Sequence, residues 1–493
     1  MKKTVIGIIF LLTCASPLTA AVRFTNNDPY PVYTSANPLG PFTYWEDCKP
    51  EQSFLFSVSF FRQNADKGRR SPFDTTPCDP NNSCANCAKV CNQDVELGDI
   101  HGPWAMLALF YPEANGNCVV GNNLIAQLGL LTFPNAVTCL AALLDPHNAD
   151  SQQERFGYFA VPVHYRKYGL RIEADIGTCW DIGLRIQTGL ATIRQNADFH
   201  DFTCSTTGDA CGPPGCVINS FSCDCTTLVV KGIMEQRNIV AETLGLDIRD
   251  FCETDIEDIT VGLYWSHCYE VNKDTKNPCW PRYTFAPYFI AEVSVPLSNL
   301  ENLNKLFALP FGTDRHWGVG FTGGFNFNFV ETIQLGLEAG FMHFSKEFYA
   351  AHPVPTSDLQ QSIFPRKADL CIRPGQTWTF GATLGASYFI SCLSFYGQFR
   401  LIHHCNDCIN IINTIPVPVL APTTACPTDN FVASNIKLEK MKKESAWDSS
   451  FFNVYFDYDI SENVALGFFW QAPITQLFAY RPTTVMASAM VKF

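Results

Sequence analysis

Long stretches of this chain alternate between apolar and polar residues at every second position. Residues 318–341 read GVGFTGGFNFNFVETIQLGLEAGF, with large apolar residues at alternate places and mostly Gly, Thr, Asn, Gln or Glu between them. Because a β-strand places successive side chains on opposite faces, this period predicts strands that have one apolar face. The joint Val330-Glu-Thr332 divides the stretch into a hairpin.

The same period recurs along most of the chain. It predicts twelve strands, at residues 53–63, about 166–176, 180–194, 256–267, 283–295, 315–329, 333–345, 376–389, 393–402, 449–459, 464–472 and 484–493. Residues 102–111 and 124–131 fit two more strands, so we expect 14 in total, within a range of 12 to 16. The joint 268–282 is long for a tight turn, which points to an error of register or count there.

The length of these strands and the places of their aromatic residues favour a transmembrane β-barrel over a soluble β-sandwich. Sandwich strands commonly have about 5–6 residues, whereas a tilted strand that crosses a bilayer needs about 9–11. Aromatic side chains at strand ends are typical of the two interfaces of an outer-membrane barrel. The aromatic residues in question are Trp180, Trp317, Trp378, Tyr388, Tyr458 and Trp470.

Connection lengths agree with this interpretation. Short joints at 177–179, 330–332, 390–392 and 460–463 alternate with large loops at 64–103, 196–255, 346–375 and 403–447. Outer-membrane barrels have short periplasmic turns and long external loops. We therefore expect an all-β, antiparallel transmembrane barrel with short periplasmic turns and long, cysteine-rich external loops.

The N-terminus predicts export. Lys2 and Lys3 precede a short apolar core, and small residues follow near position 21, so residues 1–21 are read as a signal peptide. Residues 22–52 are then a periplasmic segment and 53–493 the barrel. The terminal Phe493 resembles the signal that the barrel assembly machinery reads. Together these features predict the outer membrane of a Gram-negative-type bacterium, with membrane lipid around the wall and loops at the surface.

The inward face of the predicted strands carries the candidate functional residues. Polar side chains there suit a water-filled lumen, which predicts a porin-like channel for passive diffusion of small hydrophilic solutes. For each residue, a salt bridge that stiffens the wall is an equally good interpretation. The candidate pore-lining residues are Arg171, Glu173, Asp175, Arg185, Gln187, Asn326, Asn328, Gln334, Glu338, Gln398, Arg400, Asn453 and Asp457.

Charge and cysteine content narrow the function further. The formal net charge of −13 argues against nucleic acid as a partner, because phosphate binding needs clustered Lys and Arg. The 22 cysteines predict loop disulfides in an oxidising compartment. Cys48, Cys179 and Cys392 fall on the predicted periplasmic rim, where partners within the chain are scarce, so they are candidates for bonds between chains or to other envelope proteins.

Other chemistry is weakly supported. Cys84, Cys87 and Cys91 in one loop, and His403-His404-Cys405 with Cys408 in another, have metal-ligand types but match no complete metal-site spacing. We expect no metal, no cofactor and no enzyme, because His164 and His267 are isolated and no nucleophile motif is present.

These features resemble one bacterial family. The signal peptide, the porin-like barrel, the C-terminal Phe, the cysteine content and the sequence Cys78-Asp-Pro80 are similar to the cysteine-rich major outer-membrane porins of chlamydia-type bacteria. The resemblance is architectural and covers the mature chain. It implies a general porin that assembles as a trimer within a disulfide-linked envelope. The alternative function is an adhesin or structural surface protein, in which segments such as 104–155 or 226–246 close the lumen.

Overall fold

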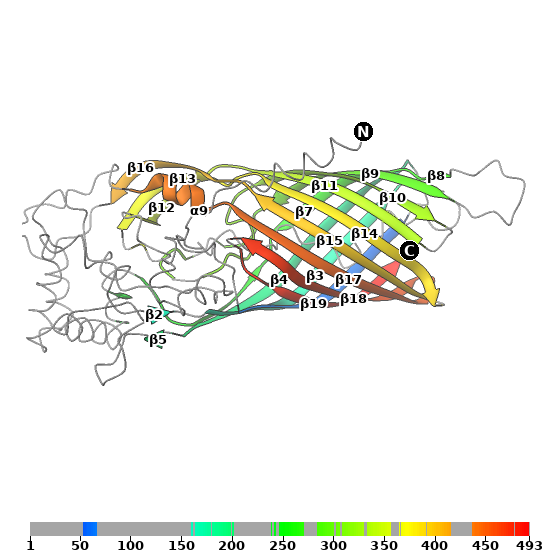
Figure 1. The fold of residues 1–493 in the computed structure, drawn as a ribbon, viewed down its shortest axis with the longest axis horizontal. Coiled ribbons are helices and arrows are strands. Elements are labelled where there is room, and N and C mark those ends of the chain that lie inside the picture. Colours follow the sequence, from blue (N-terminus) through cyan, green and yellow to red (C-terminus); the bar gives the residue numbers. More distant parts are fainter. Residues whose placement is uncertain are drawn as a thin grey trace, which may run out of the picture.

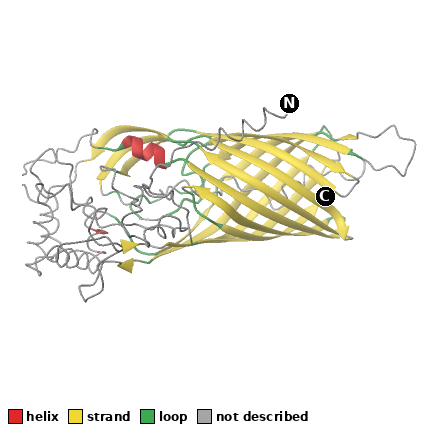
Figure 2. Cartoon of the chain, in the orientation of Figure 1, coloured by secondary structure: helices red, strands yellow, loops and turns green. Residues whose placement is uncertain are grey.

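The computed structural model describes the wall of one antiparallel β-barrel and part of the loops at one of its ends (Figure 1 and Figure 2). The described residues are 53–66, 159–160, 163–178, 180–198, 200–201, 238, 241–242, 246–270, 283–299, 302–305, 308–329, 333–355, 364, 366–390, 392–415, 436–477 and 479–492. The wall consists of β1 (Ser53–Ala65), β3 (Val163–Gly177), β4 (Ile182–Ala197), β7 (Ile259–Ser266), β9 (Thr284–Val295), β10 (Gly318–Phe329), β11 (Ile333–Phe344), β14 (Thr377–Ile390), β15 (Leu393–His404), β17 (Trp447–Ser461), β18 (Val464–Leu477) and β19 (Thr483–Lys492).

The wall closes on itself as twelve strands. Hydrogen-bonded neighbours follow the order β10-β11-β14-β15-β17-β18-β19-β1-β3-β4-β7-β9, and β9 pairs with β10. Twelve lies within the expected range of 12 to 16 but is two fewer than the favoured 14, because β1 pairs with β19 along one edge and with β3 along the other. That arrangement leaves no free edge at which another strand could enter between β1 and β3. Residues 102–111 and 124–131 lie outside the described residues.

The two ends of the barrel differ. Short connections join β3 to β4, β10 to β11, β14 to β15 and β17 to β18 at what we call the short-turn end. The connection from β7 to β9 at the same end is longer and includes β8 (Tyr269–Glu270), which pairs with β9. Because β7 and β9 are themselves paired, no strand is missing there. The opposite, long-loop end carries the remaining connections.

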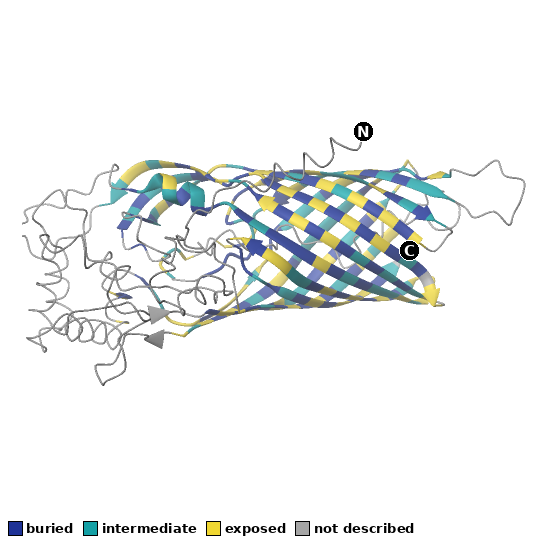
Figure 3. Cartoon of the chain, in the orientation of Figure 1, coloured by how far each residue is buried: buried dark blue, intermediate teal, exposed yellow. Residues whose placement is uncertain are grey.

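The two faces of the wall differ in the way that the alternation predicted (Figure 3). Large apolar side chains occupy the outer face, among them Phe60, Leu337 and Leu384, each more than half exposed. Trp180 and Tyr458 lie on this face at the short-turn end, and Trp317 and Trp378 at the other. An exposed apolar surface that surrounds a closed wall is stable only in contact with lipid, so the barrel is a transmembrane one.

Small residues on the inner face give room to larger neighbours. A Cβ atom added to any of three inward glycines would lie 2.1–2.6 Å from a tyrosine on the adjacent strand, so each ring lies directly over its glycine. This arrangement explains the recurrent Gly of the inward positions, because a side chain there would displace a ring. The pairs are Gly183 with Tyr264, Gly324 with Tyr288, and Gly385 with Tyr396.

One strand of the wall is interrupted by a bulge. β6 (Phe251–Ile256) and β7 both pair with β4, so that Ile256 lies opposite Leu190 and Thr260 lies opposite Gln187. Three residues of the interrupted strand therefore face two residues of β4, which is a β-bulge. In a regular strand, two adjacent side chains would lie on opposite faces of the wall. Because of the bulge, the side chains of Glu257 and Asp258 are both buried.

A small sheet stands beyond the wall at the long-loop end. β12 (Glu347–Val354), β13 (Arg366–Arg373) and β16 (Cys408–Ile415) form it in that order, and the helix α9 (Leu438–Glu444) covers it. Tyr349, Leu370, Ile409 and Met441 belong to its buried core. The predicted loops 346–375 and 403–447 thus fold together into one layer. β2 (Phe159–Ala160) pairs with β5 (His200–Asp201) in a separate two-stranded ribbon. Among the described residues, no helix has the length and hydropathy needed to cross a membrane.

Candidate functional site: the barrel interior

All the candidate pore-lining residues lie on the inner face of the wall. Asn326, Gln334, Gln398 and Asn453 are almost wholly buried, and Arg171, Glu173, Asp175, Asn328 and Arg400 are each less than one tenth exposed. The other four, Arg185, Gln187, Glu338 and Asp457, are partly exposed on the same face. The period of two therefore predicted the orientation of every residue in this set, while their partners were not predicted.

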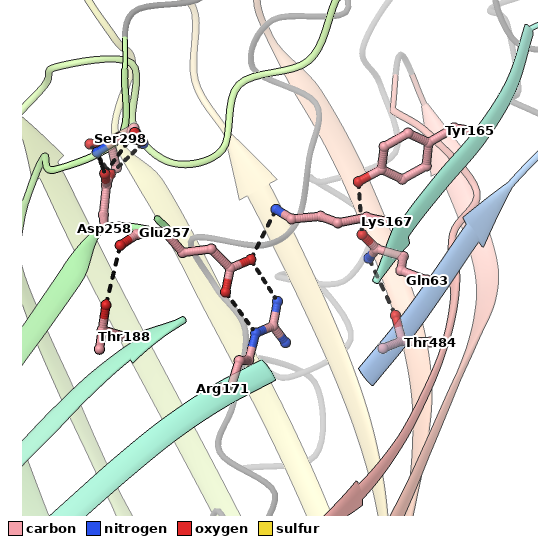
Figure 4. Close-up of polar contacts among 10 residues, drawn as sticks. Gln63, Tyr165, Lys167, Arg171, Thr188, Glu257, Asp258, Ser298 and Thr484 are labelled. Atoms are coloured by element: carbon pink, nitrogen blue, oxygen red, sulfur yellow. Dashed lines mark hydrogen bonds and ion pairs between the residues drawn. The ribbon is translucent and has the colours of Figure 1, made fainter. Parts of the chain in front are cut away.

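Nearer the long-loop end, three charged residues meet inside the wall (Figure 4). Lys167 Nζ lies 3.2 Å from Glu257 Oε1, and Arg171 Nε lies 3.2 Å from Glu257 Oε2. The side chains of Lys167 and Glu257 are fully buried, so each charge depends on the others for compensation. The Arg171 guanidinium also lies 4.0 Å from the centre of the Phe61 ring, a cation–π contact that joins β3 to β1.

The bulge places Glu257 in this cluster. A Cβ atom on Gly189 would lie 2.2 Å from Glu257 Oε2, so the glycine provides the space for the carboxylate. The backbone N–H of Glu257 donates to the carbonyl of Gly189 at 2.8 Å, and Thr188 Oγ1 donates to the carbonyl of Glu257 at 3.3 Å. β4 therefore holds the bulged residue through both backbone groups.

Asp258 anchors the connection between β9 and β10. Its Oδ1 accepts hydrogen bonds from the N–H groups of Leu297 and Ser298 and from the Ser298 hydroxyl. Its Oδ2 accepts from the N–H and hydroxyl of Thr313. Gly312 leaves room for this, because a Cβ atom there would lie 2.2 Å from the carboxyl carbon. Five donors on one carboxylate fix the loop against the wall.

A chain of neutral hydrogen bonds crosses the seam where the first and last strands meet. Tyr165 Oη donates to Gln63 Oε1 at 3.1 Å, and Gln63 Nε2 donates to Thr484 Oγ1 at 3.3 Å. Thr484 Oγ1 then donates to Gln471 Oε1 at 3.2 Å. The chain links β3, β1, β19 and β18, so the inner face reinforces the closure that the backbone ladder makes. Figure 4 shows its first two bonds, from Tyr165 to Gln63 and from Gln63 to Thr484.

Nearer the short-turn end, an arginine lies between two carboxylates. Arg185 Nε is 2.8 Å from Asp175 Oδ1 and 3.4 Å from Glu173 Oε1. Asp175 and Glu173 are inward neighbours on β3, directly opposite β4 residues in the register. The single positive charge of Arg185 therefore compensates the two carboxylates of Asp175 and Glu173.

On β11, Glu338 is the centre of a network whose other members are neutral. Tyr288 Oη donates to Glu338 Oε2 at 3.2 Å, and Gln398 Nε2 donates to Glu338 Oε1 at 3.1 Å. Asn453 Nδ2 donates in turn to Gln398 Oε1 at 3.0 Å. The partners that reach Glu338 through hydrogen bonds are thus neutral groups from β9, β15 and β17.

Several inward amides lack partners. Both side-chain atoms of Gln334 are buried without a hydrogen bond among the described residues, and so is Nδ2 of Asn326. Asn328 donates through Nδ2 to Thr284 at 2.7 Å, but its Oδ1 has no partner there either. A buried amide without a partner costs about 1–3 kcal/mol, and water or a solute in the lumen would remove that cost.

The interior also has an apolar patch that the sequence did not predict. Phe451, Tyr455, Phe469, Met486 and Met490 are buried on the inner faces of β17, β18 and β19. The rings of Tyr455 and Phe469 lie 4.7 Å apart. Adjacent aromatic residues at 451–452, 455–456 and 468–469 place one ring on each face, a signal that could have revealed this patch.

Lys167, Glu257 and Glu292 are charged interior residues that were also missed. Lys167 shares the parity of Arg171 within a predicted strand, so the period alone could have identified it. The consecutive acids Glu257 and Asp258 break the alternation, which is the mark of a bulge. Glu292 shares the inward face of β9 with Tyr288 and Ser294.

The cysteines only partly follow expectation. Cys268 is disulfide-bonded, but Cys252, Cys371, Cys392, Cys405 and Cys408 carry free thiols. In the ladder between β13 and β16, Cys371 lies opposite Asn410 and Cys408 lies opposite Arg373. The two thiols are diagonal neighbours at about 7–8 Å, too far apart for a disulfide without movement. Cys48 and Cys179 lie outside the described residues, and Cys392 is exposed at the short-turn end.

The histidines considered for metal binding or catalysis have carboxylate partners. His403 Nδ1 lies 2.5 Å from Asp448, and His404 contacts both Thr377 and Asp407. His164 lies 3.3 Å from Asp66 at one end of the barrel, and His267 lies 2.7 Å from Asp181 at the other. The part of the chain that the structure describes contains no group of three or more His, Cys, Asp or Glu side chains that could hold a metal ion.

Comparison with known proteins gives distant structural likenesses only. No family model matches the sequence, and no curated protein matches it. An outer-membrane channel from Pseudomonas putida F1 aligns over 92% of this chain and 100% of its own, with 8% identity and a TM-score of 0.42. The toluene transporter TbuX of Ralstonia pickettii aligns over 90% of each chain, with 8% identity and a TM-score of 0.27.

A Pseudomonas aeruginosa homologue of FadL aligns over 97% of this chain and 99% of its own, with 8% identity and a TM-score of 0.23. These values are too low to bear on function, which must follow from the residues of the barrel itself.

Proposed function

We propose that this protein is an outer-membrane channel through which small hydrophilic solutes diffuse passively. The observation that carries the proposal is the contrast between the two faces of the wall. Phe, Leu and Ile occupy the outer face, whereas charged and amide side chains occupy the inner face along most of the strands. A barrel that served only as a lipid anchor would have no need of this inner polarity.

Solvation energetics support a wet interior. An isolated charge in a dry interior costs several kcal/mol, even after relaxation. Arg185 and Glu257 each have close partners of opposite charge, but Gln334 and Asn326 have buried amide atoms without partners among the described residues. Water along the lumen supplies those missing hydrogen bonds at little cost.

Liposome swelling tests this proposal directly. Vesicles that contain the refolded full chain should swell in isotonic solutions of small sugars, and the rate should fall as the sugar becomes larger. Vesicles with a heat-denatured sample of the same protein are the matched control. Equal rates in both samples would contradict a channel.

A second function, the display of loops as an adhesin or structural surface protein, has one observation in its favour. Lys167, Glu257, Gln334 and Asn453 are each buried to within 1% of complete, so parts of the interior are closely packed. The sheet of β12, β13 and β16 also has its own core, as a displayed module would. Planar-bilayer recording separates the two functions, because a closed barrel gives no stepwise conductance.

Several partners remain part of the proposal. Lipid surrounds the outer face, and the barrel assembly machinery is expected to act through Phe493, which lies outside the described residues. A homotrimer and disulfide links to other envelope proteins follow from the family resemblance and from the exposed thiol of Cys392. Chemical cross-linking in native membranes would report the trimer as a band at three times the monomer mass.

A further inference from the structure

Acidic side chains outnumber basic ones on the inner face of the wall. Four basic residues point inward among the described side chains, against seven acidic ones. The basic set is Lys167, Arg171, Arg185 and Arg400, and the acidic set is Glu173, Asp175, Glu257, Glu292, Glu338, Asp457 and Asp459. This excess belongs to the lumen, since it is counted on one face only and is independent of the net charge of the chain.

The excess lies outside the cluster of Lys167, Arg171 and Glu257. The cluster of Lys167, Arg171 and Glu257, nearer the long loops, contains two cations for one anion. The other six acidic residues of the set lie outside this cluster, and we call them the carboxylate girdle. Among the described inward side chains, Arg185 and Arg400 are the remaining cations, and Arg185 is shared by Asp175 and Glu173.

The girdle extends around much of the wall. Glu173 and Asp175 belong to β3, Glu292 to β9 and Glu338 to β11, while Asp457 and Asp459 belong to β17. Register places Glu338 opposite Gly324 on β10 and opposite Gly381 on β14, so neutral residues separate it from the next acidic strand. Carboxylates distributed around a lumen act on any ion that passes along the axis.

Neutral oxygen ligands adjoin the girdle. Gln334 is on the same face of β11 as Glu338, wholly buried, and neither of its amide atoms has a hydrogen-bond partner among the described residues. The neighbouring Asn328 has an unpartnered Oδ1. Amide and carboxylate oxygens are the atoms that replace water around small hard cations.

We infer that the lumen prefers cations to anions, and that the carboxylate girdle sets this preference. The inference rests on the proposed channel function and specifies the charge class of the solute that the channel favours. The ligand is a small inorganic cation such as K⁺, attracted by the excess of carboxylates and partly coordinated by the amides beside them. The basic cluster nearer the long loops is where the preference is weakest.

The test is the reversal potential of the refolded full chain in a planar bilayer under a gradient of KCl. The expected potential lies on the potassium side of zero. Glu338→Gln keeps the size of the side chain and removes one carboxylate, so the potential should shift toward zero. Arg400→Gln removes a cation from the same level of the wall, so the potential should move further toward the potassium equilibrium value.

Glu439→Gln is the matched control. This residue lies on α9 in the loop layer and is exposed, so the substitution changes the charge of the chain equally without touching the lumen. Its reversal potential should equal that of the unsubstituted protein. The heat-dependent shift in gel mobility of each variant shows that the barrel has folded before it is recorded.

The outcomes distinguish the inference from its premise. A folded protein with no conductance overturns the channel and the inference together. Conductance with a potential at zero, or on the chloride side, overturns only the inference. A cation preference that Glu338→Gln and Arg400→Gln leave unchanged overturns the assignment to the girdle.

Discussion

Lys167 and Glu257 form an ion pair in which both side chains are wholly buried, with Nζ and Oε1 3.2 Å apart. Removal of one partner from such a pair leaves the other charge uncompensated and typically costs about 3–5 kcal/mol. Glu257→Gln should therefore lower the free energy of unfolding of the barrel by that amount, as measured by urea titration in lipid vesicles. The double variant with Lys167→Met should recover part of the loss, whereas near-wild-type stability of Glu257→Gln would refute the buried pair.

The glycines beneath the inward tyrosines should tolerate no side chain. A Cβ atom on Gly324 would lie 2.5 Å from Tyr288 Oη and 2.6 Å from the carbonyl oxygen of Leu337. Overpacking of this kind costs about 1–3 kcal/mol, so Gly324→Ala should destabilise the barrel. Gly323→Ala is the control, because its Cβ would meet nothing nearer than 3.8 Å. Equal stability of Gly324→Ala and Gly323→Ala would mean that the ring of Tyr288 does not lie over Gly324.

Charges on the outer face should be tolerated only outside the bilayer. Leu337 is exposed near the middle of β11, whereas Phe348 is equally exposed on β12 in the loop layer. An Arg at the bilayer midplane costs about 2–4 kcal/mol. Leu337→Arg should thus reduce the amount of folded barrel in the membrane fraction, and Phe348→Arg should not. If Phe348→Arg reduced the amount of folded barrel and Leu337→Arg did not, the membrane would not surround the middle of β11.

Acidification should loosen the loop layer through His316. Burial lowers the pKa of His316, although its hydrogen bond to the Ser345 carbonyl and the carboxylates of Asp314, Asp407 and Glu347 oppose the shift. Because the unfolded histidine takes up a proton near its ordinary pKa of about 6.5 and the folded one does not, stability is lost as pH falls below that value.

Hydrogen exchange in the segment 308–317 should therefore accelerate between about pH 7 and pH 5. In His316→Gln this acceleration should disappear, since no proton is taken up on unfolding. His403→Gln is the matched control, because His403 is also a histidine with a carboxylate neighbour, Asp448, and lies at the end of β15. Persistence of the acceleration in His316→Gln would show that another group is responsible.

A reducible link between chains should depend on the thiol at the short-turn end. Cys392 is free and exposed in the turn between β14 and β15. Cells that carry Cys392→Ser should lose a band that is sensitive to reductant on gels, whereas cells with Cys371→Ser, on the half-buried thiol of β13, should retain it. An unchanged band pattern in Cys392→Ser would end this hypothesis.

The sequence predicted the wall well because the wall is made of one repeated physical rule. Lipid outside and polar groups inside impose the period of two on every strand, and all twelve strands of the wall were found by it. The favoured number of 14 exceeded the twelve strands observed, which lie within the expected range, because local alternation contains no information about closure, which depends on the pairing of β1 with β19 and β3.

Interactions between distant segments could not be predicted. Lys167 belongs to β3 and Glu257 follows β6, and β4 lies between these two strands and pairs with both. Glu257 reaches Lys167 because the bulge turns its side chain inward. The sheet of β12, β13 and β16 joins two loops that are separate in the sequence, and its strands show the same alternation as any exposed ribbon. Partners of this kind depend on topology, which the period of the residues does not contain.

The pairing of the first and last strands has a consequence for biogenesis. Asn64 lies opposite Thr483, so the ladder that seals the cylinder joins residues at the two extremes of the polypeptide. No partial product lacking β19 can form a sealed cylinder, and its unpaired edges would be open to aggregation. Closure of the cylinder therefore cannot be completed before β19 reaches the edge of β1.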